Sequence, residues 1–236
     1  MKRLSMMLAA AGAALTLTAP PAEAVLTLTL TDTGTGSSVT CLDPGGGPVG
    51  CTIVNPTVVT FNGAVGGWTT ALTSAFTNSP GSPTLATLDI TSLFLMNNTD
   101  AIGNFSITAT ATGYSLPPGD PLFFFGSASM SSIGTSGTTT SISYFDPSDS
   151  GLLLNPITCV LAPGTNSSCA EPGINVNNGG GTYSITQVLN ITNVGIGQTL
   201  NLTANQSVRS VPEPGSLALA AGALLIAAGV ARRRRS

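Results

Sequence analysis

The sequence predicts an all-β protein: an antiparallel, jelly-roll-like β-sandwich with an N-terminal signal helix before it and a C-terminal transmembrane helix after it. Residues 25–31 alternate strictly between apolar residues and threonine, as a half-buried strand does. The chain up to residue 210 continues in short runs rich in β-branched residues, separated by Gly, Pro, Asn and Asp. None of these runs has the 3.6-residue apolar period and capping residues of a helix. We expect roughly ten strands in one sandwich.

In the first half of the body, the expected strands are residues 25–31, 38–41, 51–61, 68–72, 85–96 and 105–111. The run at 51–61 contains Asn55-Pro56, where a bulge or break is expected because proline cannot donate to a sheet ladder. The run at 85–96 is expected to be interrupted near Asp89, since Asp is rare inside strands.

A stretch rich in Pro and Gly at residues 116–121 divides the body into halves. After it, the expected strands are residues 122–125, 141–145, 183–191 and 199–204, and residues 152–154 and 157–161 lead into the turn between the second pair of cysteines. Residues 127–140 are rich in Ser, Gly and Thr, and they predict either a loop or a polar edge.

The first 24 residues have the three parts of a secretory signal peptide. Lys2 and Arg3 form a positive start, residues 4–17 are mostly apolar, and Ala22-Glu23-Ala24 is an A-x-A cleavage site. Cleavage after Ala24 would make Val25 the mature N-terminus. The expected partners at this stage are the Sec translocon and signal peptidase.

The C-terminal end predicts a membrane span. Residues 216–231 carry no charge, and a helix of this length is about 24 Å long, slightly short for a hydrocarbon core of about 30 Å. Local membrane thinning and snorkelling arginines can close that gap. The positive charges of Arg232, Arg233, Arg234 and Arg235 keep this end cytoplasmic, so the rest of the chain lies outside.

Just before this span, Pro212-Glu213-Pro214 is expected to be extended and exposed, because proline disfavours helix in itself and in the residue before it. The order of this motif, the apolar segment and the arginine cluster over residues 211–236 resembles the PEP-CTERM sorting signal of Gram-negative bacteria. The resemblance implies that an exosortase, a membrane transpeptidase-like enzyme, recognises the motif and removes the tail. It also implies a transient inner-membrane anchor and a final place at the cell surface or in a biofilm-associated extracellular matrix, possible partners there including exopolysaccharide. A plain C-terminal membrane anchor is the alternative.

Between the two processed ends, residues 25–210 form the predicted secreted domain. It carries eight acidic residues against Arg209 alone, a net charge near −7, and it has no lysine or histidine. This composition argues against nucleic acid as a partner, because nucleic-acid binding needs a basic surface. The surface must consist largely of Thr, Ser, Asn and Gly, which suits hydrogen bonding to glycans and also simply keeps a secreted protein soluble.

The four cysteines lie in the exported part, where disulfides persist. Cys41 and Cys51 are ten residues apart, as are Cys159 and Cys169, and each pair brackets a turn sequence. Local pairing, with each disulfide stapling a loop or hairpin, is the simplest interpretation, although four cysteines allow three connectivities. The spacing and the lack of histidine do not fit a zinc site.

The search for chemistry predicts no enzyme, no cofactor and no metal. A serine nucleophile would lack its usual histidine or lysine base. A carboxylate pair could cleave a glycosidic bond, but the acidic residues lie mostly in predicted turns. We expect Asp146 and Asp149 to cap a turn, with calcium binding as the alternative. We expect Trp68 in the core, with a sugar-stacking platform as the alternative.

The sequence therefore predicts an exported structural protein of the cell surface or extracellular matrix. The alternatives are a carbohydrate-binding or adhesin module and, on weaker grounds, an extracellular hydrolase.

Overall fold

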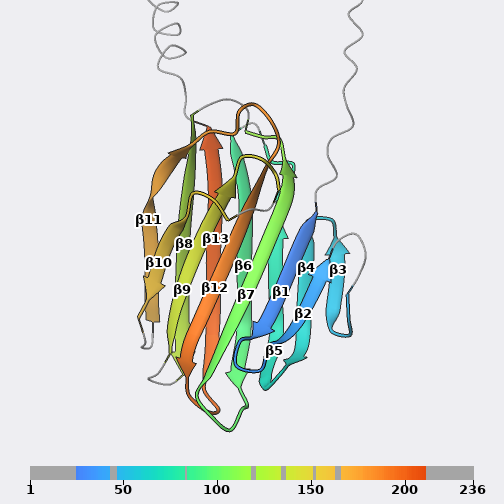
Figure 1. Cartoon of the computed structure of the whole chain (residues 1–236), viewed down its shortest axis with the longest axis vertical. Coiled ribbons are helices and arrows are strands. Elements are labelled where there is room, and N and C mark those ends of the chain that lie inside the picture. Colours follow the sequence, from blue (N-terminus) through green and yellow to red (C-terminus); the bar gives the residue numbers. More distant parts are fainter. Residues whose placement is uncertain are drawn as a thin grey trace, which may run out of the picture.

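The computed structural model describes residues 25–42, 47–82, 84–117, 121–133, 137–150, 153–162 and 166–210. The regular secondary structure of these residues consists of β-strands, which form two antiparallel sheets (Figure 1). The all-β prediction is confirmed. The predicted signal helix and transmembrane helix lie outside the described residues, and within those residues no helix is long and apolar enough to cross a membrane.

The six-stranded sheet has the order β10 (Ile157–Leu161), β9 (Thr138–Asp146), β12 (Tyr183–Val194), β7 (Gly103–Tyr114), β1 (Leu26–Asp32) and β2 (Ser37–Leu42). The seven-stranded sheet has the order β11 (Asn166–Val176), β8 (Leu122–Ile133), β13 (Thr199–Ser210), β6 (Leu85–Asn97), β5 (Trp68–Thr77), β4 (Val58–Val65) and β3 (Cys51–Asn55). The last two strands are inserted between earlier ones: β12 lies between β9 and β7, and β13 between β8 and β6.

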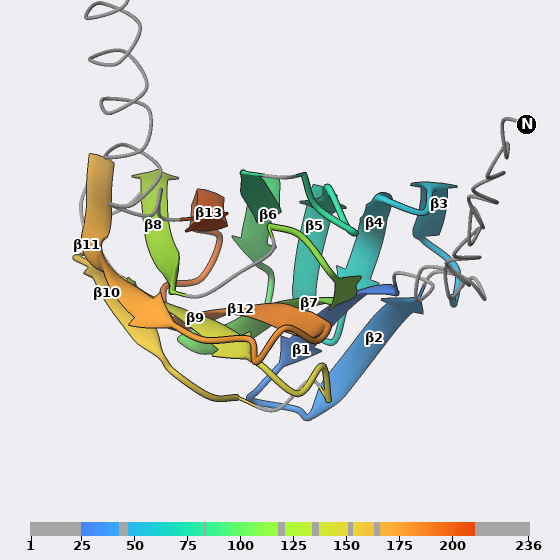
Figure 2. The same cartoon turned by 90° about the horizontal axis from the view of Figure 1, so that it is seen from above.

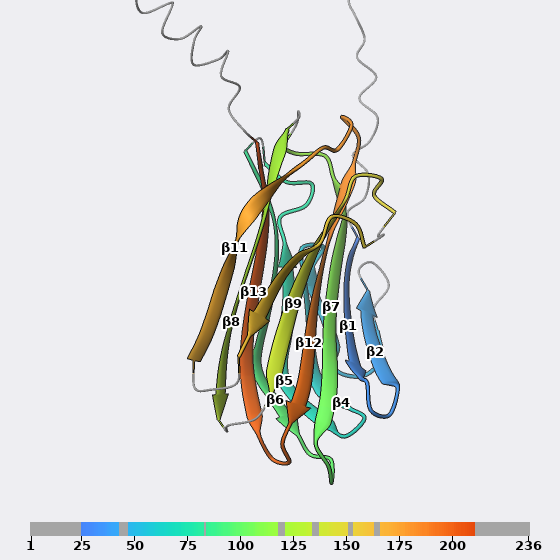
Figure 3. The same cartoon turned by 60° about the vertical axis from the view of Figure 1, so that its left-hand side comes forward.

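The two sheets lie face to face as two layers, with the core between them (Figures 2 and 3). Strict alternation builds this core: in β1, Leu26, Leu28 and Leu30 are fully buried, and the threonines between them face out. Trp68 is also fully buried, with its ring centroid 5.0 Å from that of Phe105, so the core interpretation of Trp68 is confirmed.

Within the described residues there are thirteen strands, more than the ten or so expected. The break expected at Asn55-Pro56 is confirmed, because Pro56 and Thr57 form the turn that separates β3 from β4. Much of residues 127–140, for which the sequence predicts a loop or a polar edge, is strand, since β8 runs on to Ile133 and β9 begins at Thr138. The interruption predicted near Asp89 is wrong: β6 is continuous there, and its pairing with β13 shifts instead between Leu200 and Leu202.

Both cysteine pairs are local disulfides, Cys41–Cys51 and Cys159–Cys169, with Cα–Cα distances of 5.5 and 6.0 Å. They do not staple hairpins within one sheet, however. The first joins β2 to β3 and the second joins β10 to β11, and these are the edge strands of the two sheets. Each disulfide therefore ties one sheet to the other, one at each edge of the sandwich.

Candidate functional site

The predicted processing sites flank the described domain. Val25 immediately precedes β1, and its backbone N–H donates to Thr112 Oγ1 at 3.4 Å. Ala24 lies outside the described residues, as do Pro212, Glu213, Pro214 and the four arginines 232–235. The last described residue, Ser210, is also the last residue of β13.

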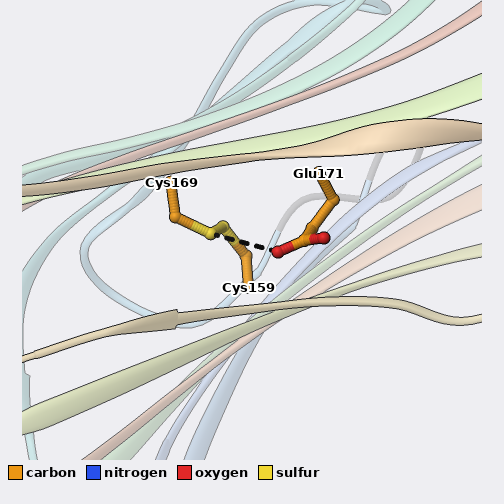
Figure 4. A group of neighbouring side chains, drawn as sticks. All are labelled: Cys159, Cys169 and Glu171. Carbon is orange, nitrogen blue, oxygen red and sulfur yellow. Dashed lines mark hydrogen bonds between the residues drawn. A yellow bond between two sulfur atoms is a disulfide. The ribbon is translucent and has the colours of Figure 1, made fainter.

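Among the described residues, one group of potential metal ligands is gathered: Cys159, Cys169 and Glu171, whose ligand atoms lie within 4.8 Å of one another (Figure 4). Both sulfur atoms belong to the disulfide, so neither is available as a thiolate ligand. Glu171 Oε1 lies 3.8 Å from Cys169 Sγ, which carries no proton in the disulfide. A single carboxylate remains, and this donor set does not fit a metal ion.

Asp146 caps its turn as predicted, whereas Asp149 lies in the same turn but its carboxylate bonds to strand β7. The buried carboxylate of Asp146 accepts the backbone N–H groups of Ser148 and Ser150, each at 2.9 Å, and both serine hydroxyls. Asp149 accepts the Gly113 N–H at 2.9 Å, and burial raises the pKa of its carboxyl above the usual range. Their oxygens are thus already engaged by the protein.

Asp32 links the two sheets at the end of β1. Its buried carboxylate accepts the N–H groups of Gly34 and Thr35 in the following turn, and that of Gly67 in the turn between β4 and β5, at 3.0–3.2 Å. Burial works to raise the pKa of Asp32, but these hydrogen bonds outweigh it and hold the pKa below its ordinary value.

The outer face of β6, β13, β8 and β11, here called the polar face, is the most distinctive surface of the seven-stranded sheet. From β13 it receives, at alternate positions, Asn201, Thr203, Asn205, Ser207 and Arg209. From β8 it receives Phe123, Phe125, Ser127, Ser129 and Ser131. Two hollows lie along it, one of about 260 Å³ beside Ser129 and Asn201 and one of about 340 Å³ beside Asp89 and Phe125.

Asp89 lies in the second hollow, on β6, with Asn205 of β13 and Phe76 of β5 as its register neighbours. It is half-buried and makes no side-chain hydrogen bond within the described part of the chain. Burial therefore raises the pKa of its carboxyl to about 6.

Aromatic rings mark one end of the polar face. The rings of Phe123 and Phe125 stack with centroids 5.9 Å apart, and the guanidinium carbon of Arg209 lies 5.3 Å from the Phe125 centroid. The ring of Phe125 also lies against the backbone of Gly173 in β11, where a Cβ atom would come within 2.5 Å of it.

The sequence analysis did not identify this face as a site. The signal was present in residues 199–210, where polar and apolar residues alternate along β13 except at the buried Gln206. The side chains of β8 and β6 join it only through strand pairing between distant parts of the chain.

Comparison with known proteins supports the sorting signal. The model of the PEP-CTERM protein-sorting motif matches residues 210–235. No curated protein matches the chain.

Two solved structures show a distant likeness. The structure of infectious bursal disease virus Gx strain is 12% identical with a TM-score of 0.30, and the likeness covers 81% of this chain and 52% of that one. The VP2 subviral particle of infectious bursal disease virus is 12% identical with a TM-score of 0.19, covering 84% and 64%. The chain thus spans about half of the first and under two thirds of the second, and at these TM-scores neither likeness bears on function.

Residues 210–235 therefore carry a PEP-CTERM protein-sorting motif, which implies export with a transient membrane anchor in Gram-negative bacteria and sorting by an exosortase.

Proposed function

We propose that the domain of residues 25–210 is a structural protein of the cell surface or extracellular matrix, and not an enzyme. The observation that carries this proposal is the pair of disulfides that ties the two sheets together at both edges. Disulfides persist outside the cell, and edge strands fixed in this way resist opening and pairing with other chains. Such a body suits a long-lived, passive role.

The position of the sorting motif is compatible with this role. The match begins at Ser210, where β13 ends, so a cut near Pro212 to Pro214 would leave every described strand intact. The released product would then keep both disulfides and the complete core.

The chemistry of the domain supports a non-enzymatic role. The chain contains no histidine, and its lysine lies in the predicted signal peptide. The carboxylates of Asp32 and Asp146 accept backbone hydrogen bonds in turns, and that of Asp149 accepts one from Gly113 in β7, so all three hold the backbone.

Cell fractionation with a motif variant tests the sorting and the final location. Wild-type protein is expected in the surface or matrix fraction, whereas a variant with Pro212, Glu213 and Pro214 replaced by alanine is expected in the inner membrane. Thr108→Ala, which lies on the six-stranded sheet and leaves the motif intact, is the matched control. Equal distribution of motif variant and wild type would contradict exosortase-dependent sorting.

A second assay tests the absence of catalysis. The purified protein is incubated with the exopolysaccharide of its host, and the reducing ends are counted over time. We expect no increase over buffer. A release of reducing ends that scales with protein concentration would overturn the structural assignment in favour of a hydrolase.

A further inference from the structure

The two outer faces of the sandwich carry the same kinds of side chain but use them differently. On the six-stranded sheet, outward hydroxyls bond to each other across strands: Thr29 to Thr40 at 3.1 Å and Thr110 to Thr186 at 3.0 Å. Such cross-strand pairs are a means of stabilising the sheet itself.

On the polar face the corresponding groups are free. Ser129, Asn201, Thr203 and Asn205 make no side-chain hydrogen bond within the described residues, although they lie on adjacent strands. Asn201, Asn205 and Ser129 are exposed. The half-buried carboxyl of Asp89 lies beside them and is likewise without a hydrogen-bond partner there.

These free groups limit the chemistry of a ligand. Hydroxyls and amides both donate and accept hydrogen bonds, so a well-matched ligand presents many of both and leaves none of them buried without a partner. An apolar ligand would leave them unsatisfied. An anionic polymer would meet Arg209 as the single basic residue of a domain with a net charge near −7.

The shape of the polar face narrows the class of ligand further. The two hollows follow the strands from Asn201 to Arg209, and the eight steps between these residues correspond to about 27 Å of extended strand. The second hollow, at the Arg209 end, is lined by Phe125, whose ring offers an apolar surface. A ligand that is extended, uncharged and rich in hydroxyls, with apolar patches between them, matches this surface.

We propose that the polar face of β6, β13, β8 and β11 binds an uncharged polysaccharide chain, with Asn201, Thr203, Asn205 and Ser129 hydrogen-bonding to its hydroxyls. Asp89 accepts hydrogen bonds from the same chain, and the Phe125 end contacts the apolar face of a sugar ring. This inference names a partner for the proposed matrix protein. It rests on the proposed function only for the extracellular location in which the protein and the polysaccharide meet.

Affinity electrophoresis under native conditions tests the proposal. The full chain, purified with its disulfides intact in mild detergent, is run in gels containing hydroxyethyl cellulose, dextran, galactomannan or the anionic polymer alginate. We expect at least one uncharged polymer to retard the wild type and alginate not to retard it. The detergent keeps the protein in solution whether or not the C-terminal tail has been removed. The intact mass of the same preparation reports the removal of the tail separately.

Variants locate the site. The double variant Asn201→Ala with Asn205→Ala is expected to weaken retardation about tenfold, since each loses the donors and acceptors of one amide. Thr203→Ala and Thr108→Ala form a matched pair: both are half-buried outward threonines of central strands without a side-chain hydrogen bond in the described chain, but Thr108 lies on the six-stranded sheet. Thr203→Ala should weaken binding and Thr108→Ala should not.

Three results would overturn the proposal: no retardation by any uncharged polymer, stronger retardation by alginate, or equal binding by the double variant and the wild type. If binding is lost in the double variant, its unchanged unfolding midpoint in urea shows that the fold is intact. If the urea midpoint of the double variant is shifted, the comparison of Thr203→Ala with Thr108→Ala decides whether the polar face binds the polymer.

Discussion

The outer faces of the two sheets differ in where their hydrogen bonds go. On the six-stranded sheet, the hydroxyl of Thr110 bonds to Thr186, and Ser106 donates to Asn190 at 3.2 Å. On the polar face, side chains of the same types, such as Thr203 and Asn205, stay without partners in the described protein. The six-stranded sheet thus bonds several of its outward polar groups to each other, and the polar face leaves its central ones available to a ligand.

The comparison shows that a surface of Ser, Thr and Asn side chains can serve different purposes in the same protein. Register neighbours bond on one face and not on the other: Thr110 bonds to its register neighbour Thr186, whereas Thr203 makes no side-chain hydrogen bond in the described residues although Ser129 is its register neighbour. The following predictions probe the two faces, and the edges that join them.

The largest effect is expected at the edges. Removing either disulfide, as Cys41→Ala with Cys51→Ala or as Cys159→Ala with Cys169→Ala, should lower the free energy of unfolding by about 3 kcal/mol, because both close loops of the same length. Urea unfolding of both variants measures this. A much larger loss of unfolding free energy on removing one of the disulfides would show that the two edges do not contribute equally to stability.

Asp89 gives the next test, through pH. Its folded pKa of about 6 lies above the unfolded value near 3.9, so the folded protein loses stability as pH rises between these values. Asp89→Asn should therefore raise the unfolding temperature at pH 7 and leave it unchanged at pH 3.5.

Asp32 serves as the control of opposite sign. Its pKa is lowered in the folded state, so its contribution is present at neutral pH and is lost as pH falls through that lowered folded value. Asp32→Asn should lower the unfolding temperature at pH 7. The same pH dependence for both variants would contradict the assigned environments.

The smallest effect compares the faces directly. Thr110→Val removes a cross-strand hydrogen bond and should cost about 1 kcal/mol of unfolding free energy, whereas Thr203→Val removes none and should cost about zero. Urea unfolding midpoints of the two variants measure the difference. Equal costs would mean that the hydroxyl pairs of the six-stranded sheet contribute nothing to stability.

Local patterns were enough to predict much of this fold. Alternation over residues 25–31 located β1, and the shared spacing of ten predicted which cysteines pair. The same spacing could not show that each disulfide joins two sheets, because a hairpin and a corner between sheets both bring Cα atoms within about 6 Å.

The strand β11 was missed because it contains Pro172 and Gly173, which usually end a strand. An edge position and a register shift between Glu171 and Ile174 accommodate both residues.

The polar face could not be predicted from composition alone. Thr110 and its partner Thr186 are 76 residues apart, so the sequence does not show which hydroxyls are paired and which stay free. That distinction depends on side-chain geometry between strands that are distant in the sequence, because Thr203 and Ser129 are also register neighbours and yet make no side-chain hydrogen bond in the described residues.

The intact mass of the protein from its native host, reduced and non-reduced, tests the central claim of export and processing most directly. The account predicts a chain from Val25 to about residue 212, with a mass difference of four hydrogens for the two disulfides. A mass that still includes residues 217–235 would contradict it, because the tail would then be a permanent anchor and not a sorting signal that is removed.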